Sequence, residues 1–128
     1  MECRCRSIAA PQLYLIRHGE TAWSITGQHT GFTDIALTAH GEEQARALAP
    51  HLRTMHFRKI LTSPLRRARQ TCESAGLGAE AEMEPDLVEW NYGDYEGKRT
   101  VDIQEERPGW KMMVTFTTFA LVITFIRI

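Results

Sequence analysis

Two short apolar runs have the length and composition of β-strands. Residues 12–17 follow Pro11 and residues 58–62 form the second run, and both fit short strands. Residues 18–36 are rich in small polar side chains and lack any hydrophobic periodicity, which predicts a loop. A loop of this length inside a compact domain usually has a function.

Two helices are predicted from their capping residues and apolar spacing. Thr38 is a candidate N-cap of the first helix, and Pro50 should kink this helix or end it early because it lacks a backbone donor. Its buried face should consist of four residues at the i, i+3, i+4, i+7 spacing: Ala45, Leu48, Ala49 and Leu52. The second helix should begin with Ser63 as N-cap and Pro64 at the first helical position, and should end at Gly76.

This order of strand, helix, strand, helix predicts an α/β fold with a parallel pair of strands and a right-handed crossover. Ligands of open α/β sheets bind beyond the carboxyl ends of the strands. His18 follows the first predicted strand and Ser63 follows the second. We therefore expect both residues at the same edge of the sheet.

The first strand ends in residues that suit a phosphate site. Arg17 offers a fixed fork of donors to phosphate oxygens. His18 offers a ring nitrogen that can act as nucleophile, base or ligand near neutral pH. Gly19 permits a tight turn and a close approach of a ligand to the backbone. The alternative is that these residues are an ordinary strand end before a polar loop. Motifs elsewhere in the chain are needed to distinguish this alternative from a phosphate site.

Two later stretches carry further candidate chemistry. Arg66 and Arg69 are three residues apart and share one helix face, so Arg67 is predicted to point elsewhere, toward the strand edge. The start of a helix favours anions, although a solvated basic face is the alternative. Glu89 follows two apolar residues, and partial shielding from water would raise its pKa and suit a general acid. The alternative for Glu89 is an ordinary surface carboxylate.

Composition limits the classes of function. The 128 residues make one domain or part of one, and a formal net charge of −1 gives no reason to expect a nucleic-acid partner. An odd number of cysteines (Cys3, Cys5 and Cys72) without an apolar secretory signal predicts a reducing, cytoplasmic setting. Residues 1–11 hold a lone Cys-x-Cys pair without the further ligands of a metal site, and this segment is predicted to be disordered.

Taken together, these segments resemble the histidine phosphatase superfamily, which includes the cofactor-dependent phosphoglycerate mutases. The matching motifs occur in the expected order: residues 17–23, residues 27–31, Leu37-Thr38 with Gly41, residues 62–68, and Glu89 with Tyr92-Gly93 and Glu96-Gly97. The resemblance implies a three-layer α/β/α fold with a mostly parallel sheet, incomplete at the C-terminal end. It assigns residues 12–110 to the N-terminal part of a histidine phosphatase-like domain.

The resemblance also implies roles for individual residues. His18 would be the nucleophile that becomes phosphorylated, and Glu89 would protonate the leaving oxygen. Arg17 and Arg67 would bind the phosphate and offset its charge. Substrate contacts are implied for four more residues: Ser24, Thr30, Gly31 and Tyr92. The implied partner is a small-molecule phosphate ester, with no metal and no other cofactor, and the sequence does not specify an oligomeric state.

Three hypotheses for the function remain open. Residues 27–31 and 90–97 resemble the sugar-phosphatase branch. This resemblance predicts a phosphatase of small metabolites, with sugar phosphates as the favoured substrates, acting through phosphohistidine. Phosphoryl transfer of the phosphoglycerate mutase type is the second hypothesis. The third is a catalytically impaired chain that binds only phosphate or a partner, because the second histidine of the family, in a His-Gly context on a later strand, is not found here. Loss of one donor beside the transferring group typically costs about 100- to 1000-fold in rate.

Residues 111–128 form an apolar, almost uncharged tail that differs from the rest of the chain. The tail is shorter than the about 20 apolar residues of a membrane span and contains four threonines, so a membrane span is not expected. It is predicted either to pair with an edge of the sheet or to be an unrelated sequence of uncertain structure.

Overall fold

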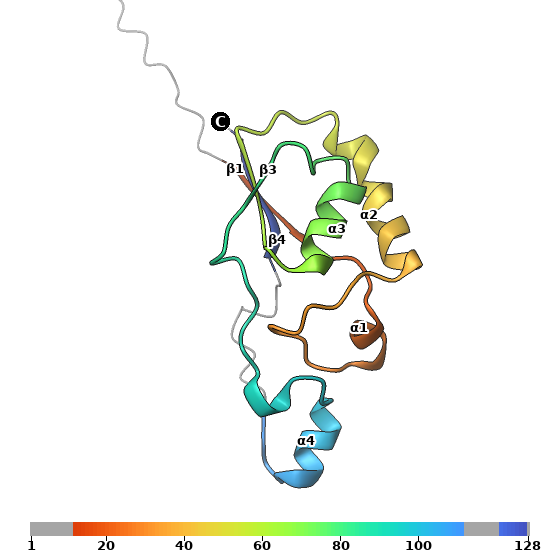
Figure 1. The fold of residues 1–128 in the computed structure, drawn as a ribbon, viewed down its shortest axis with the longest axis vertical. Coiled ribbons are helices and arrows are strands. Elements are labelled where there is room, and N and C mark those ends of the chain that lie inside the picture. The colour runs from red at the N-terminus through yellow and green to blue at the C-terminus, as the bar shows by residue number, and fades with distance from the viewer. Residues whose placement is uncertain (1–11, 112–120, 128) are drawn as a thin grey trace, which may run out of the picture.

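The computed structural model describes residues 12–111 and 121–127, with side chains for residues 12–111 (Figure 1). Its centre is a four-stranded sheet in the order β1-β4-β2-β3. The strands are β1 (Gln12–Arg17), β2 (Lys59–Thr62), β3 (Ala81–Met83) and β4 (Leu121–Arg127). Strand β4 runs antiparallel to both β1 and β2, while β2 and β3 are parallel. Three strands therefore share one direction, and the predicted α/β class with a mostly parallel sheet is confirmed.

The position of β4 corrects one expectation. The first two strands were predicted to be a hydrogen-bonded parallel pair, but β4 lies between them. Thr124 is in register with Leu15 of β1 on one side and with Leu61 of β2 on the other. The tail was predicted to reach an edge of the sheet, and its residues 121–127 instead pair on both sides.

Two helices cover one face of the sheet, α2 (Ala39–Leu52) and α3 (Arg66–Ser74) (Figure 1). Tyr14 and Ile16 of β1 pack against the core beneath them, which contains Leu52, Ile60, Ala68, Cys72, Ala75 and Leu77. Leu13 and Leu15 alternate with these two residues and are 59% and 50% exposed on the other face. The described residues thus supply two of the three predicted layers, the sheet and one helical layer.

Helix α2 begins as predicted, since the Thr38 hydroxyl accepts a hydrogen bond from the Gly41 backbone N–H at 3.0 Å. Its buried positions are Gly41, Ala45, Ala49 and Leu52. The prediction that Leu48 is buried was wrong, because it lies beside this face and is 36% exposed. Of the two outcomes predicted at Pro50, a kink or an early end, the early end does not occur. The helix continues to Leu52, and the next bond, from Arg53 N–H to Ala49 O, still forms at 3.0 Å.

Helix α3 starts two residues later than predicted, with Leu65 as its N-cap. Ser63 instead closes a small turn before the helix, where its hydroxyl accepts from the Leu65 N–H at 3.3 Å. The chain leaves the helix at Gly76, whose φ of +82° follows the C-cap Ala75, so the predicted end is correct to within one residue.

Two short helices, α1 (Ala22–Thr26) and α4 (Thr100–Glu106), lie beyond one end of the sheet (Figure 1). Helix α1 was missed, because it falls inside the segment predicted to be a loop. The predicted disorder of residues 1–11, with their Cys-x-Cys pair, and the first half of the tail lie outside the described residues. Within the described part of the chain, no helix is long and apolar enough to cross a membrane.

Candidate active site

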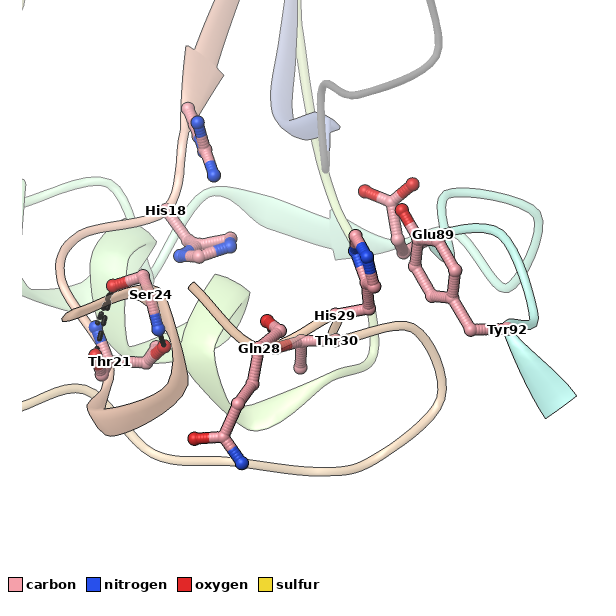
Figure 2. A pocket seen from close by; sticks show the side chains of 9 residues that line it. His18, Thr21, Ser24, Gln28, His29, Thr30, Glu89 and Tyr92 are labelled. Atoms are coloured by element: carbon pink, nitrogen blue, oxygen red, sulfur yellow. Dashed lines mark hydrogen bonds between the residues drawn. The ribbon is translucent and has the colours of Figure 1, made fainter. Parts of the chain in front are cut away.

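A cavity of about 90 Å³ opens beside the carboxyl end of β1 (Figure 2). It is lined by Arg17, His18, Thr21, Ser24, Gln28, His29, Thr30, Glu89 and Tyr92. These residues come from the end of β1, from α1 and its flanking loops, and from the segment before α4. In Figure 2, His18 lies on one side of the cavity, while His29, Glu89 and Tyr92 are grouped on the other. The volume is well below the roughly 300–1,000 Å³ of pockets that enclose a whole small molecule, so it suits one small group such as a phosphoryl group.

The turn after β1 is fixed by contacts with α2 and α3. The Gly19 N–H donates to the Thr71 hydroxyl at 3.0 Å, and the Thr38 N–H donates to the Glu20 carbonyl at 2.9 Å. A side chain at Gly19 would collide with the backbone carbonyl of Gly41 in α2. Glycine at position 19 is therefore required by close backbone packing, which holds the neighbouring His18 in place.

The imidazole of His18 is oriented by its own turn. Its Nδ1 lies 2.7 Å from the Gly19 carbonyl oxygen. Since a carbonyl oxygen only accepts, Nδ1 carries the hydrogen in this contact and Nε2 keeps its lone pair. An imidazole held in this way presents Nε2 as a nucleophile.

The surroundings also keep His18 uncharged. Burial of the ring lowers its pKa from 6.5 to about 4, helped by the positive charges of Arg67 and Arg17 and opposed by the Gly19 carbonyl. The ring is therefore neutral near pH 7. The positive charges of Arg17 and Arg67 disfavour a proton on His18 and favour an anion bound beside it.

Arg67 is buried, only 1% exposed, while Arg66 and Arg69 face solvent as predicted. Its two terminal nitrogens donate to the carbonyls of Gly31 at 2.9 Å and Thr33 at 3.0 Å. Arg67 and Gly31, both predicted to contact substrate, lie behind the cavity wall instead of among its lining residues. Arg67 still contributes its charge, which acts on both His18 and Glu89.

A carboxylate holds the same loop from the other side. Glu96 accepts hydrogen bonds from the Gly31 N–H at 2.8 Å, the Phe32 N–H at 3.1 Å and the Thr33 hydroxyl at 2.7 Å. These bonds outweigh its burial and lower its pKa. Residues 31–33 are thus fixed between a guanidinium on their carbonyl side and a carboxylate on their N–H side.

Glu89 is the carboxyl group on the cavity wall. Burial raises its pKa above the ordinary 4.5, while the Trp90 N–H at 3.1 Å and the charges of Arg67 and Arg17 act in the opposite direction. The net direction agrees with the shielding inferred from the apolar residues before it. A carboxyl group with a raised pKa can hold a proton for transfer to a leaving oxygen.

Ser24 lines the cavity, but its hydroxyl is already occupied. It accepts from the Thr21 N–H at 2.9 Å and donates to the Thr21 carbonyl at 2.9 Å, while the Thr21 hydroxyl accepts from the Ser24 N–H at 3.1 Å. This reciprocal capping box begins α1 (Figure 2). Ser24 can contact a ligand only if this capping arrangement changes or bonds are shared.

Four residues of this site were not predicted to belong to it: Thr21, Gln28, His29 and Glu96. Thr21 is a favoured N-cap residue type, which was the available signal for it, although Ser24 stands where the usual capping box has Glu or Gln. Gln28 and His29 belong to the Gly-Gln-His-Thr-Gly motif, whose resemblance was noted without a role for either side chain. No local pattern marks Glu96 as the anchor of a loop some sixty residues earlier.

Comparison with known proteins gives a consistent result. The model of the histidine phosphatase superfamily (branch 1) matches residues 13–118. The chain is 43% identical over 101 residues to an acid phosphatase of Mycobacterium tuberculosis, covering 77% of this chain and 49% of that protein. It is 36% identical over 102 residues to a probable phosphoglycerate mutase, GpmB, of Enterobacter sp., covering 78% and 47%.

A solved structure agrees in fold. The mycobacterial glucosyl-3-phosphoglycerate phosphatase, determined in complexes with VO3, superimposes with a TM-score of 0.71 at 31% identity. The match covers 79% of this chain and 51% of that one. The chain thus spans about half the length of the proteins that it matches.

Proposed function

Because the chain belongs to branch 1 of the histidine phosphatase superfamily, we propose that it hydrolyses phosphate monoesters of small metabolites through a phosphohistidine at His18. The observation that carries the proposal is the state of His18. Its ring is neutral, its Nδ1 is bonded to the Gly19 carbonyl, and its Nε2 is unprotonated beside two guanidinium charges. Glu89, with its raised pKa, lines the same cavity.

The proposed reaction has two displacements at phosphorus. In the first, the Nε2 lone pair of His18 forms a bond to phosphorus while the bond to the ester oxygen breaks, and Glu89 donates its proton to that oxygen. In the second, Glu89 takes a proton from water, the water oxygen bonds to phosphorus, and the P–N bond breaks. Arg17 and Arg67 offset the negative charge of the phosphoryl group throughout. The products are an alcohol, inorganic phosphate and neutral His18.

An aryl phosphate assay tests this proposal. His18→Ala removes the nucleophile, so we expect turnover to fall to the background rate and, after an alkaline quench that preserves the P–N bond, the variant to carry no label from a ³²P-ester. His40→Ala, on the exposed surface of α2, is the matched control and should retain wild-type turnover. Equal rates for the wild type and His18→Ala would refute the proposal.

Phosphoryl transfer of the mutase type is the second candidate, supported by the similarity to the probable phosphoglycerate mutase. A mutase would interconvert phosphoglycerates faster than it releases inorganic phosphate. Measuring both products from one phosphoglycerate incubation separates the two activities. We favour hydrolysis because Arg17 is the only cation among the described residues that line the cavity.

The impaired chain is the third candidate, and its support comes from the positions of the histidines. Of the histidines other than His18, His29 alone lines the described cavity, and His40, His51 and His56 are exposed. Binding of inorganic phosphate without turnover of any ester would identify this case. The cytoplasmic setting expected from the cysteine count stays a prediction.

A further inference from the structure

His29 lines the cavity but has no part in the proposed reaction. Its ring stacks on Tyr92, with centroids 5.0 Å apart and an interplanar angle of 22°, and meets Trp110 at 5.9 Å. Its Nε2 lies 3.2 Å from the Thr100 hydroxyl at the start of α4. These contacts fix both the plane and the rotation of the imidazole.

The backbone around His29 is equally fixed. The His29 N–H donates to the Lys98 carbonyl at 2.9 Å, and the Gly97 N–H donates to the His29 carbonyl at 2.9 Å. The loop is therefore paired with the segment that leads into α4. A side chain on such a framework is positioned before a ligand arrives, which reduces the entropy lost on binding.

One ring nitrogen of His29 is left for a ligand. Among the described residues, its side chain makes a single hydrogen bond, through Nε2 to Thr100. Burial lowers the pKa of the ring, although the Glu96 carboxylate opposes the shift, so the ring is neutral near pH 7. A neutral imidazole has one donor and one acceptor nitrogen.

The partner that fits Nδ1 is a hydroxyl group. The Thr100 hydroxyl can donate to Nε2 or accept from it, so Nδ1 is a donor in one arrangement and an acceptor in the other. A ligand hydroxyl satisfies both arrangements, whereas a carboxylate satisfies only the first and an ammonium group only the second.

Charge on this side of the cavity points the same way. Lys98 forms an ion pair with Glu106 at 2.8 Å, and Arg99 forms one with Asp102 at 2.6 Å. These two cations are thus paired with acids, while Arg107 donates to the neutral Tyr95 hydroxyl at 2.7 Å. On this side the cavity itself is lined by the rings of His29 and Tyr92 and by the Glu89 carboxyl group, without a lysine or arginine among the described lining residues (Figure 2). A second anionic group on the substrate would find no unpaired cation among the described residues that line this side of the cavity.

We propose that His29 is a specificity-determining residue that binds a hydroxyl group in the alcohol part of the substrate. The substrate class is then phosphate monoesters of polyhydroxylated compounds such as sugars. This inference rests on the proposed function, because it assumes that the phosphoryl group occupies the cavity beside His18. The stacked rings of His29 and Tyr92 would form the side of the cavity that contacts the alcohol part of the substrate.

The test compares two esters with one substitution. Phenyl phosphate has no hydroxyl in its leaving group, and ribose 5-phosphate has several. His29→Phe keeps an aromatic ring for Tyr92 and removes both nitrogens. We expect the ratio of kcat/KM for ribose 5-phosphate to kcat/KM for phenyl phosphate to fall about fivefold to tenfold, the value of one neutral hydrogen bond. His56→Phe, at an exposed position, is the matched control.

Two further measurements keep the test decisive. His29→Asn restores a donor and an acceptor, and should recover part of the selectivity for ribose 5-phosphate. The ratio of the Kd values of both esters, measured by NMR titration of the 128-residue chain, reports the same selectivity without turnover. An equal effect of His29→Phe on both esters, by rate and by Kd, would overturn the inference while leaving the proposed function intact. A wild-type chain that neither binds nor hydrolyses either ester would overturn both.

Discussion

The proposed nucleophile and proton donor have pKa values displaced in opposite directions, which predicts an acidic pH optimum. His18 must be unprotonated to attack, and its pKa is lowered to about 4. Glu89 must be protonated to donate, and its pKa is raised. The active combination therefore predominates from about pH 4 up to the raised pKa of Glu89, and kcat/KM should decline above it.

The size of the effect follows from the shift at His18. At pH 5, an imidazole with a pKa of about 4 is about 90% neutral, whereas one with the ordinary value of 6.5 is only about 3% neutral. The environment of His18 therefore increases the amount of available nucleophile about 30-fold at this pH. The difference of 2.5 pKa units corresponds to about 3 kcal/mol.

The assay is kcat/KM for phenyl phosphate between pH 3.5 and pH 8, for the wild type and Glu89→Gln. The substrate itself ionises near pH 6, but this contribution cancels in the ratio of wild type to variant. We expect the wild-type advantage to be largest at low pH and to disappear as Glu89 loses its proton. The acidic limb, near pH 4, should be common to both proteins.

Two results would refute this reasoning. An acidic limb near pH 6.5 would mean that His18 is not desolvated in the working protein. A ratio of wild type to Glu89→Gln that is independent of pH would mean that Glu89 does not supply the proton.

Three further predictions concern the residues that shape the site. His18→Asn should flatten the pH dependence of stability, because the unfolded chain binds a proton at His18 below pH 6.5 while the folded chain does so only near pH 4. Between pH 7 and pH 5, the free energy of unfolding in urea should therefore fall by about 2 kcal/mol more for the wild type than for the variant. Parallel pH curves for the two proteins would contradict this prediction. Arg67→Lys keeps the charge but loses the two hydrogen bonds to the carbonyls of Gly31 and Thr33, so the free energy of unfolding in urea should fall by about 3 kcal/mol. A fall of less than about 1 kcal/mol would show that the loop does not depend on the guanidinium. Ser24→Ala removes the capping box of α1 and should lower the free energy of unfolding by about 1 kcal/mol in the same assay. The Kd for inorganic phosphate should change little. A large change in this Kd at unchanged stability would instead show that Ser24 contacts phosphate directly.

Local patterns in the sequence predicted the parts of the fold that local physics determines. The strand ending at Arg17 and the helix capped by Thr38 were found because apolar spacing and a capping hydroxyl are sufficient to specify them. Helical geometry predicted that Arg67 points away from the solvent-facing side shared by Arg66 and Arg69, but not that its side chain is buried. The raised pKa of Glu89 agrees with one of the two interpretations of its apolar neighbours, shielding from water, and the other was an ordinary surface carboxylate.

The errors arose where distant contacts decide the structure. Nothing in the run 121–127 indicates that it pairs between two strands, because strand order depends on the whole sheet. The donation of Arg67 to two carbonyls depends on a loop that Glu96 holds in place. The position of His29 depends on Tyr92 and Thr100, which lie far along the chain. In each case the individual residues were visible, but their partners could not be identified from spacing.

The strand order has a consequence for how this molecule assembles. Gln12 at one end of β1 pairs with Arg127, and the described strands include no other neighbour for β1. Contacts between such distant residues form slowly, because a long stretch of chain must close before any of them is gained. During synthesis, the strand that leads into His18 has to wait for residues 121–127 to emerge. If synthesis stops before residue 121, the edge of β1 that pairs with β4 stays unpaired and can form hydrogen bonds with strands of other chains.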